Sequence, residues 1–264
     1  MPDYLYAIIG ITLIFVCTTL GALLVFFFRK KEISKTLNKI FVGFAAGVML
    51  SASFFSLIKP AIEADISYMP TWTIVAISIV LGGGFLWLID KLVPHFHIGE
   101  NKEEGLSSNG LSKTSKMFLA VTIHNIPEGL ACGIAFGVAL ANPGNHALIV
   151  GALLLAVGLG IQNIPEGAAV ALPIKGETGS SLKAFLFGMF SGIVEPIAAV
   201  VGLFLALEIQ PLMPWALAFA AGCMIYVVGE EMIPEMKGEG HDHLGVWSFI
   251  IGFVVMMILD CITF

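Results

Sequence analysis

Two segments of the chain decide the fold: SKMFLAVTIHNIPEGLACGIAFGVAL at residues 115–140 and HALIVGALLLAVGLGIQNIPEGAAVALP at residues 146–173. Each is long enough to cross the hydrocarbon core of a bilayer, which takes about 20 mainly apolar residues in a helix. Each also contains almost the same polar hexapeptide, HNIPEG at 124–129 and QNIPEG at 162–167. Two apolar helices with matching polar motifs indicate a site inside a membrane-spanning helix bundle.

The composition of the rest of the chain leads to the same fold class. Of the 264 residues, 58% are hydrophobic and 12% are charged, whereas about a quarter of the residues of a soluble domain are charged. We therefore predict an all-α integral membrane protein that forms one transmembrane domain over residues 1–264. Eight segments are long and apolar enough to span a bilayer: about 4–28, 38–59, 70–92, 115–140, 146–173, 181–207, 211–236 and 244–263.

The basic residues predict the orientation, because Lys and Arg are enriched in cytoplasmic loops. Every Lys and Arg except Lys59 falls on the same side of the predicted helices. That side includes the polar loop at about 93–114, which we expect to be flexible and cytoplasmic. With eight helices, both termini are then extracytoplasmic in a multi-pass protein of the cell membrane.

The polar motifs form an inverted repeat, because consecutive spanning helices run antiparallel. In the first motif, His124 and Asn125 lie four and three residues before Glu128, so the three side chains occupy neighbouring lines of one helix face. The second motif repeats this arrangement with Gln162, Asn163 and Glu166. Inverted repeats are typical of secondary transporters, whose substrate site lies near the bilayer midplane.

Prolines and glycines accompany these polar residues. Pro127 and Pro165 are expected to kink the helices and to free backbone carbonyls. Gly129 and Gly167, next to the carboxylates, permit close approach of a neighbouring helix.

Three glutamates, Glu128, Glu166 and Glu195, lie within predicted membrane helices. A charged carboxylate at that depth costs about 2.5–3.5 kcal/mol on insertion scales, and no Lys or Arg lies in the central part of these helices. A bound cation or a proton would balance them; glutamates that serve only as protonated or amide-paired helix contacts are the alternative. Imidazole, carboxylate and carboxamide ligands favour zinc, iron(II), manganese or cadmium.

The paired motifs, together with Val194-Glu195-Pro196, resemble the ZIP (Zrt-, Irt-like protein) family, and in particular its bacterial GufA-like branch. The resemblance implies an inverted-repeat 3+2+3 helix bundle with a binuclear metal site between the fourth, fifth and sixth helices. It assigns one metal position to His124, Glu128, Gln162, Glu166 and Met49. It assigns the other to Asn125, Asn163 and Glu195, with Glu128 and Glu166 able to bridge the two.

The resemblance also implies a pathway for the ion. Ser56 and Glu63 would lie towards the outer entrance, and Glu230 and Glu231 on the release path. Many family members have His and Asp where this chain has Gln162 and Asn163, so weaker binding is expected. The role of the His residues on the cytoplasmic side stays open.

From these features we predict a secondary transporter that brings divalent metal ions, zinc first, into the cytoplasm by elevator-type alternating access. The metals are cargo, and neither a prosthetic group nor a nucleic-acid partner nor an enzymatic activity is expected; a homodimer is compatible with the sequence. A metal efflux carrier is the alternative with the same ligands. An intramembrane metal hydrolase is less favoured, because HExxH is absent and His124 is the one His in the interior of a predicted span.

Overall fold

The computed structural model describes residues 2–27, 34–64, 66, 68–93, 95–96, 103–104, 113–208, 210–237 and 243–262. Within these ranges, eight helices are long and apolar enough to cross a membrane, which confirms the predicted fold class. The first four spans comprise α1 (Asp3–Leu23) with η1 (Leu24–Phe26), α2 (Lys35–Ala52) with η2 (Ser53–Ile58) and α3 (Lys59–Glu63), α4 (Thr71–Leu92), and α5 (Lys113–Ala141). The last four comprise α6 (His146–Thr178), α7 (Ser181–Ser191) with α8 (Val194–Glu208), α9 (Met213–Val227) with η4 (Val228–Met232) and α10 (Ile233–Lys237), and α11 (Leu244–Cys261).

Short elements lie at the helix ends. The 3₁₀ turn η3 (Gln210–Leu212) precedes α9. Most of the predicted loop at about 93–114 falls outside the described residues, but two short strands within it, β1 (His95–Phe96) and β2 (Glu103–Glu104), pair antiparallel.

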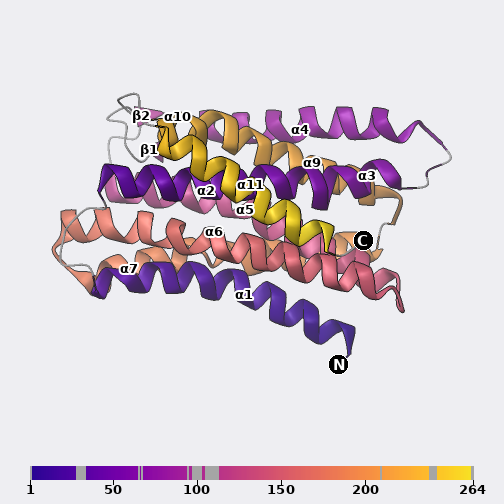
Figure 1. Cartoon of the computed structure of the whole chain (residues 1–264), viewed down its shortest axis with the longest axis horizontal. Coiled ribbons are helices and arrows are strands. Elements are labelled where there is room, and N and C mark those ends of the chain that lie inside the picture. The colour runs from indigo at the N-terminus through magenta and orange to yellow at the C-terminus, as the bar shows by residue number, and fades with distance from the viewer. Residues whose placement is uncertain are drawn as a thin grey trace.

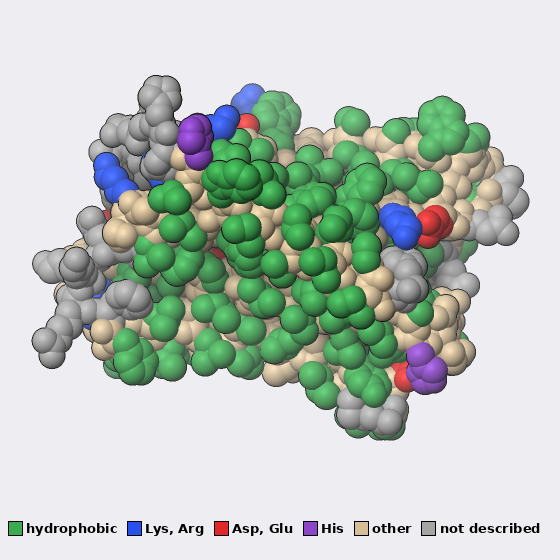
Figure 2. All heavy atoms as spheres, in the orientation of Figure 1, with side chains coloured by type: hydrophobic (Ala, Val, Ile, Leu, Met, Phe, Trp, Pro, Cys, Tyr) green, Lys and Arg blue, Asp and Glu red, His purple; other side chains and the backbone are tan. Residues whose placement is uncertain are grey.

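The helices lie roughly along the long axis of the molecule, and both chain termini are at the same end (Figure 1). Figure 2 shows a broad band of apolar side chains between the two ends, while the charged side chains gather at the ends. Large apolar side chains such as Val80 and Ile197 are 74% and 62% exposed. Such a surface would be unfavourable in water and suits a lipid environment.

The spans form two groups of packed helices. The first group, here called the motif bundle, consists of α1, α5, α6, α7 and α8. The second, here called the outer bundle, consists of α2, α4, α9 and α11 together with η2, α3, η4 and α10, which continue α2 and α9. The closest helix pairs meet at glycines, because a Cβ there would overlap the backbone of the partner helix. These contacts are Gly167 on Thr18, Gly129 on Glu195, Gly47 on Phe249 and Gly82 on Phe219.

Prolines mark three interruptions of regular α-helix. The sixth span breaks at Gly192 and Ile193, just before Pro196. The π-helical segments η2 and η4 precede Pro60 and Pro234, where a wider turn relieves the clash of the proline ring with the preceding turn. By contrast, α5 and α6 remain helical through the motif prolines.

Candidate metal centre

Close backbone packing joins helices of the motif bundle in pairs at the level of the carboxylates. Gly129 follows Glu128 on α5 and lies against the backbone of Glu195 on α8; Gly167 follows Glu166 on α6 and lies against the backbone of Thr18 on α1. The absence of a side chain at these glycines lets the helices approach as predicted. The carboxylates of Glu128 and Glu166 therefore lie next to close helix contacts of the motif bundle.

The break in the sixth span determines where Glu195 lies. After α7 ends at Ser191, the chain turns at Gly192 and Ile193, and Glu195 occupies the first turn of α8. Its backbone N–H donates to the carbonyl of Gly192 at 3.1 Å. The break therefore places Glu195 at a helix N-terminus, the end of a helix that interacts favourably with negative charge.

Glu195 is completely buried, and one of its carboxylate oxygens accepts hydrogen bonds from two helices. The Thr18 hydroxyl donates to Oε1 at 2.6 Å, and Nδ2 of Asn125 donates to the same oxygen at 3.1 Å. Asn125 also donates to the carbonyl of Ser191 at 3.0 Å. The predicted association of Asn125 with Glu195 is thus present, and Thr18 is an additional contact.

Glu128 lies opposite Gln162, whose side-chain amide donates to its Oε1. Both side chains are buried. The carboxylate of Glu128 interacts electrostatically with those of Glu166 and Glu195. The motif bundle therefore concentrates three acidic groups in its interior.

Several oxygen atoms in this cluster lack a hydrogen-bond partner within the described part of the chain. They are Oδ1 of Asn125, Oε2 of Glu128, Oε1 of Gln162, Oδ1 of Asn163 and Oε2 of Glu195. Buried polar atoms without partners are costly. Carboxylate and carboxamide oxygens are suitable ligands for a divalent cation, so a bound ion would satisfy these atoms. We call this group of residues the central site.

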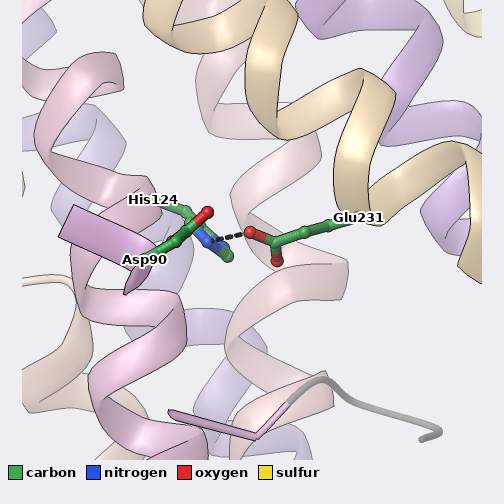
Figure 3. Close-up of side chains that lie close together, drawn as sticks. All are labelled: Asp90, His124 and Glu231. Atoms are coloured by element: carbon green, nitrogen blue, oxygen red, sulfur yellow. Dashed lines mark ion pairs between the residues drawn. The ribbon is translucent and has the colours of Figure 1, made fainter. Parts of the chain in front are cut away.

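His124 lies at the edge of this site and faces the outer bundle. Its Nε2 is 2.5 Å from Oε1 of Glu231, and Figure 3 shows the imidazole between Glu231 and Asp90. One ligand atom from each of the three residues lies within 4.8 Å of the others. We call these three residues the inner triad. His124, which was expected at the first metal position, therefore contacts Glu231 of the predicted release path. The hydrogen bond to Glu128 comes from Gln162, another residue expected at that position.

Glu166 connects the two groups of residues. Its carboxylate interacts electrostatically with His124 and Glu231 on one side and with Glu128 and Glu195 on the other. This half-buried side chain lies between the central site and the inner triad. An ion could pass from one to the other while it remained near the same carboxylate.

The remaining predicted site residues lie elsewhere along the spans. Met49 is buried in α2, a helix that packs against α6. Ser56, in η2, donates to Oδ1 of Asp260 at 2.6 Å. Glu63, at the end of α3, and Glu230, in η4, are exposed. The structure thus adds Asp260 as a partner of the predicted entrance residue Ser56.

Some contacts of the site were absent from the sequence-based prediction. Thr18 gave no signal beyond being a polar residue in an apolar run, and Asp90 gave none beyond being a carboxylate near the end of a predicted helix. The side chains of His95, His97 and His241 lie outside the described residues. The π-helical segments have a readable signal, because each ends shortly before a proline.

Comparisons with known proteins identify the family. The family model for ZIP zinc transporters matches residues 4–117 and 115–260. The chain belongs to the ZIP family. It is 34% identical over 248 residues to the zinc transporter GufA of Myxococcus xanthus, with 92% of this chain and 93% of GufA covered. It is 33% identical over 259 residues to the zinc transporter ZIPB of Bordetella bronchiseptica, with 97% of this chain and 80% of ZIPB covered.

A eukaryotic member of the ZIP family is also similar over nearly the full length. The human zinc transporter ZIP11 is 34% identical over 336 residues, with 96% of each chain covered. These similarities confirm the predicted family and its bacterial branch. They place the chain among ZIP transporters rather than among enzymes.

Proposed function

We propose that this ZIP-family transporter carries divalent transition-metal ions, with zinc as the main cargo, into the cytoplasm. The observation that carries the proposal is the central site, where carboxylate and amide oxygens without partners converge in the membrane interior. Iron(II), manganese and cadmium suit the same ligands. The names of the similar proteins, GufA and ZIPB among them, support zinc over these alternatives.

The central site consists of residues of the motif bundle, and this supports an elevator-type mechanism. Asn125 and Glu128 on α5, Gln162 and Asn163 on α6, and Glu195 on α8 would move together if the motif bundle shifted as a body, and so would the neighbouring Glu166 on α6. Their mutual contacts would then be kept during transport, because the close helix contacts at Gly129 and Gly167 lie inside the same bundle. The ion would change its access without changing most of its ligands.

Two groups of polar contacts outside the central site support a pathway with two ends. Ser56 and Asp260 lie in η2 and at the end of α11, close to the end of the molecule that holds both termini (Figure 1). The inner triad lies towards the opposite end, since Asp90 is near the end of α4. We infer that ions enter past Ser56, bind at the central site and leave past Glu231. With the predicted orientation of the basic residues, this direction is uptake.

Zinc uptake by the purified protein in liposomes tests the proposal. Glu128→Ala and Glu166→Ala should each abolish uptake, because each removes a carboxylate that a central ion would share. Glu208→Ala is the matched control, since Glu208 is exposed at the end of α8, and it should transport like the wild type. Normal uptake by either central variant would refute the site, and export from zinc-loaded vesicles without uptake would favour the efflux alternative.

The proposed orientation has a separate test. Cys261, at the end of α11, is the one exposed cysteine, while Cys132 and Cys223 are buried and Cys17 is half-buried. A membrane-impermeant maleimide added to intact cells should label the wild type at Cys261 and should not label Cys261→Ser. Labelling that requires permeabilised cells would place the C-terminus in the cytoplasm and reverse the proposed direction.

A further inference from the structure

The helix α1 positions the hydroxyl of Thr18 to donate a hydrogen bond to the carboxylate of Glu195. Thr18 is completely buried, and its Oγ1 is 2.6 Å from Oε1 of Glu195 and 3.2 Å from the carbonyl of Ile14. A hydroxyl has one proton to donate. The carboxylate oxygen of Glu195 is closer than the carbonyl oxygen of Ile14, and it is the stronger acceptor for that proton.

The hydrogen bonds from Thr18 and Asn125 both go to the same carboxylate oxygen of Glu195. Both donate to Oε1, whereas Oε2 has no partner among the described residues. Two donors on one oxygen fix the rotation of the carboxylate group. They leave the second oxygen for other ligands of Glu195, and the side chain of Asn163 also interacts with this carboxylate.

The packing around Thr18 fixes its side chain. A Cβ on Gly192 would come within 2.8 Å of the Thr18 methyl carbon Cγ2, and the backbone carbonyl of Thr18 lies directly against Gly167. A β-branched side chain in a helix has few rotamers available. The hydroxyl is therefore held towards Glu195 by α6 and by the turn between α7 and α8.

We propose that Thr18 is a positioning residue of the second metal position, the one formed by Asn125, Asn163 and Glu195. It holds one carboxylate oxygen of Glu195 so that the other faces the cargo ion; it does not itself bind the metal. This inference rests on the proposed function. Removing hydrogen-bond partners that orient metal ligands typically weakens metal affinity about 10- to 100-fold.

Metal binding to the full-length purified protein, measured by isothermal titration calorimetry with cadmium, tests the proposal. Thr18→Val has nearly the same shape and lacks the hydroxyl, so it should weaken one class of binding site about 10- to 100-fold and leave the other class unchanged. Thr18→Ser restores the donor and should recover most of the affinity. Thr19→Val is the matched control, because the hydroxyl of the neighbouring Thr19 donates to the carbonyl of Phe15 in its own helix at 2.9 Å.

The outcomes separate this inference from the proposed function. If Glu128→Ala abolishes cadmium binding but Thr18→Val binds like the wild type, the role of Thr18 is wrong and the central site stands. If Thr19→Val loses as much affinity as Thr18→Val, or Thr18→Ser fails to recover it, the loss reflects packing of α1 and overturns the inference. If the wild type binds no cadmium, the proposed function itself fails.

Discussion

The central site and the inner triad are neighbouring acidic clusters that are built differently. The central site draws its residues from helices of one bundle, and several of its oxygens lack protein partners. The inner triad draws Asp90 and Glu231 from the outer bundle and His124 from the motif bundle, and His124 and Glu231 already pair with each other. The first arrangement suits a site that persists while a bundle moves, and the second suits a contact that forms and breaks with that movement.

The two clusters should also differ in their effect on the binding and the release of the ion. Oxygens without partners gain from an ion, because a cation replaces hydrogen bonds that the protein does not supply. A cation at the inner triad must instead compete with the His124–Glu231 pair. We therefore expect affinity to depend on the central site and transport rate to depend on the inner triad.

The largest effect is expected from disturbing the packing of the central site. In Gly129→Ala, the new methyl group would overlap the backbone carbonyl of Glu195, so α5 and α8 must separate. Overpacking of this kind costs about 1–3 kcal/mol of folding free energy, and the carboxylates would also lose their alignment. Thermal unfolding and zinc binding should both deteriorate.

Gly151→Ala is the matched control for this variant, because a methyl group at Gly151 in α6 meets open space. Its unfolding temperature and zinc affinity should stay near those of the wild type. Equal behaviour of Gly129→Ala and Gly151→Ala would remove the argument that the central site depends on the close contact of α5 with α8.

An intermediate effect is expected from breaking the inner triad. Glu231→Gln keeps the size of the side chain but removes its charge, so His124 loses its ionic partner. Hydrogen bonds to charged groups contribute about 1.5–3 kcal/mol. Because of this contribution, we expect the zinc transport rate to change by about tenfold. Zinc affinity should change by less than about threefold. Rates in liposomes and affinities by calorimetry measure the two quantities separately.

Glu230→Gln provides the control, since the exposed Glu230 is the adjacent residue of the same π-helical segment. It should leave both quantities unchanged. If Glu231→Gln instead reduces zinc affinity as severely as Glu128→Ala, the two clusters act as one site and the distinction between them is wrong.

The smallest effect is expected at the outer end of the pathway. Ser56→Ala removes one hydrogen bond to Asp260, which keeps further interactions of its own. We expect KM for zinc to change by at most about threefold, because a single hydrogen bond commonly contributes about 0.5–1.5 kcal/mol. Concentration-dependent uptake in liposomes gives this value.

The matched change is Ser51→Ala, which removes a buried hydroxyl that has no hydrogen-bond partner in the described structure. Its KM should equal that of the wild type. A similar change in both variants would point to packing of the second span rather than to the contact of Ser56 with Asp260.

The spans and the central motif were predictable because their signals are local. Apolar runs of about 20 residues define membrane helices, and the described helices begin and end within a few residues of the predicted limits. The polar faces of Asn125, Glu128 and Gln162 follow from helical spacing. Gly129 also indicated close helix packing, but the sequence does not show that this glycine contacts the backbone of Glu195.

The inner triad was not predictable as a unit, because Asp90, His124 and Glu231 lie on three helices and meet only through tertiary packing. Thr18 shares this difficulty, since nothing in its own segment indicates that it faces Glu195. His124 shows the limit of the spacing argument: four residues before Glu128, it shares that helix face, yet its imidazole reaches across the bundle boundary to Glu231.

The central claim is that carboxylates of the motif bundle share a cargo ion. Anomalous diffraction from crystals of the full-length protein soaked in cadmium tests it most directly. The account predicts an anomalous peak within ligand distance of both Glu128 and Glu166, which Glu128→Ala removes. A peak confined to Asp90, His124 and Glu231, with none between the motif carboxylates, would contradict it.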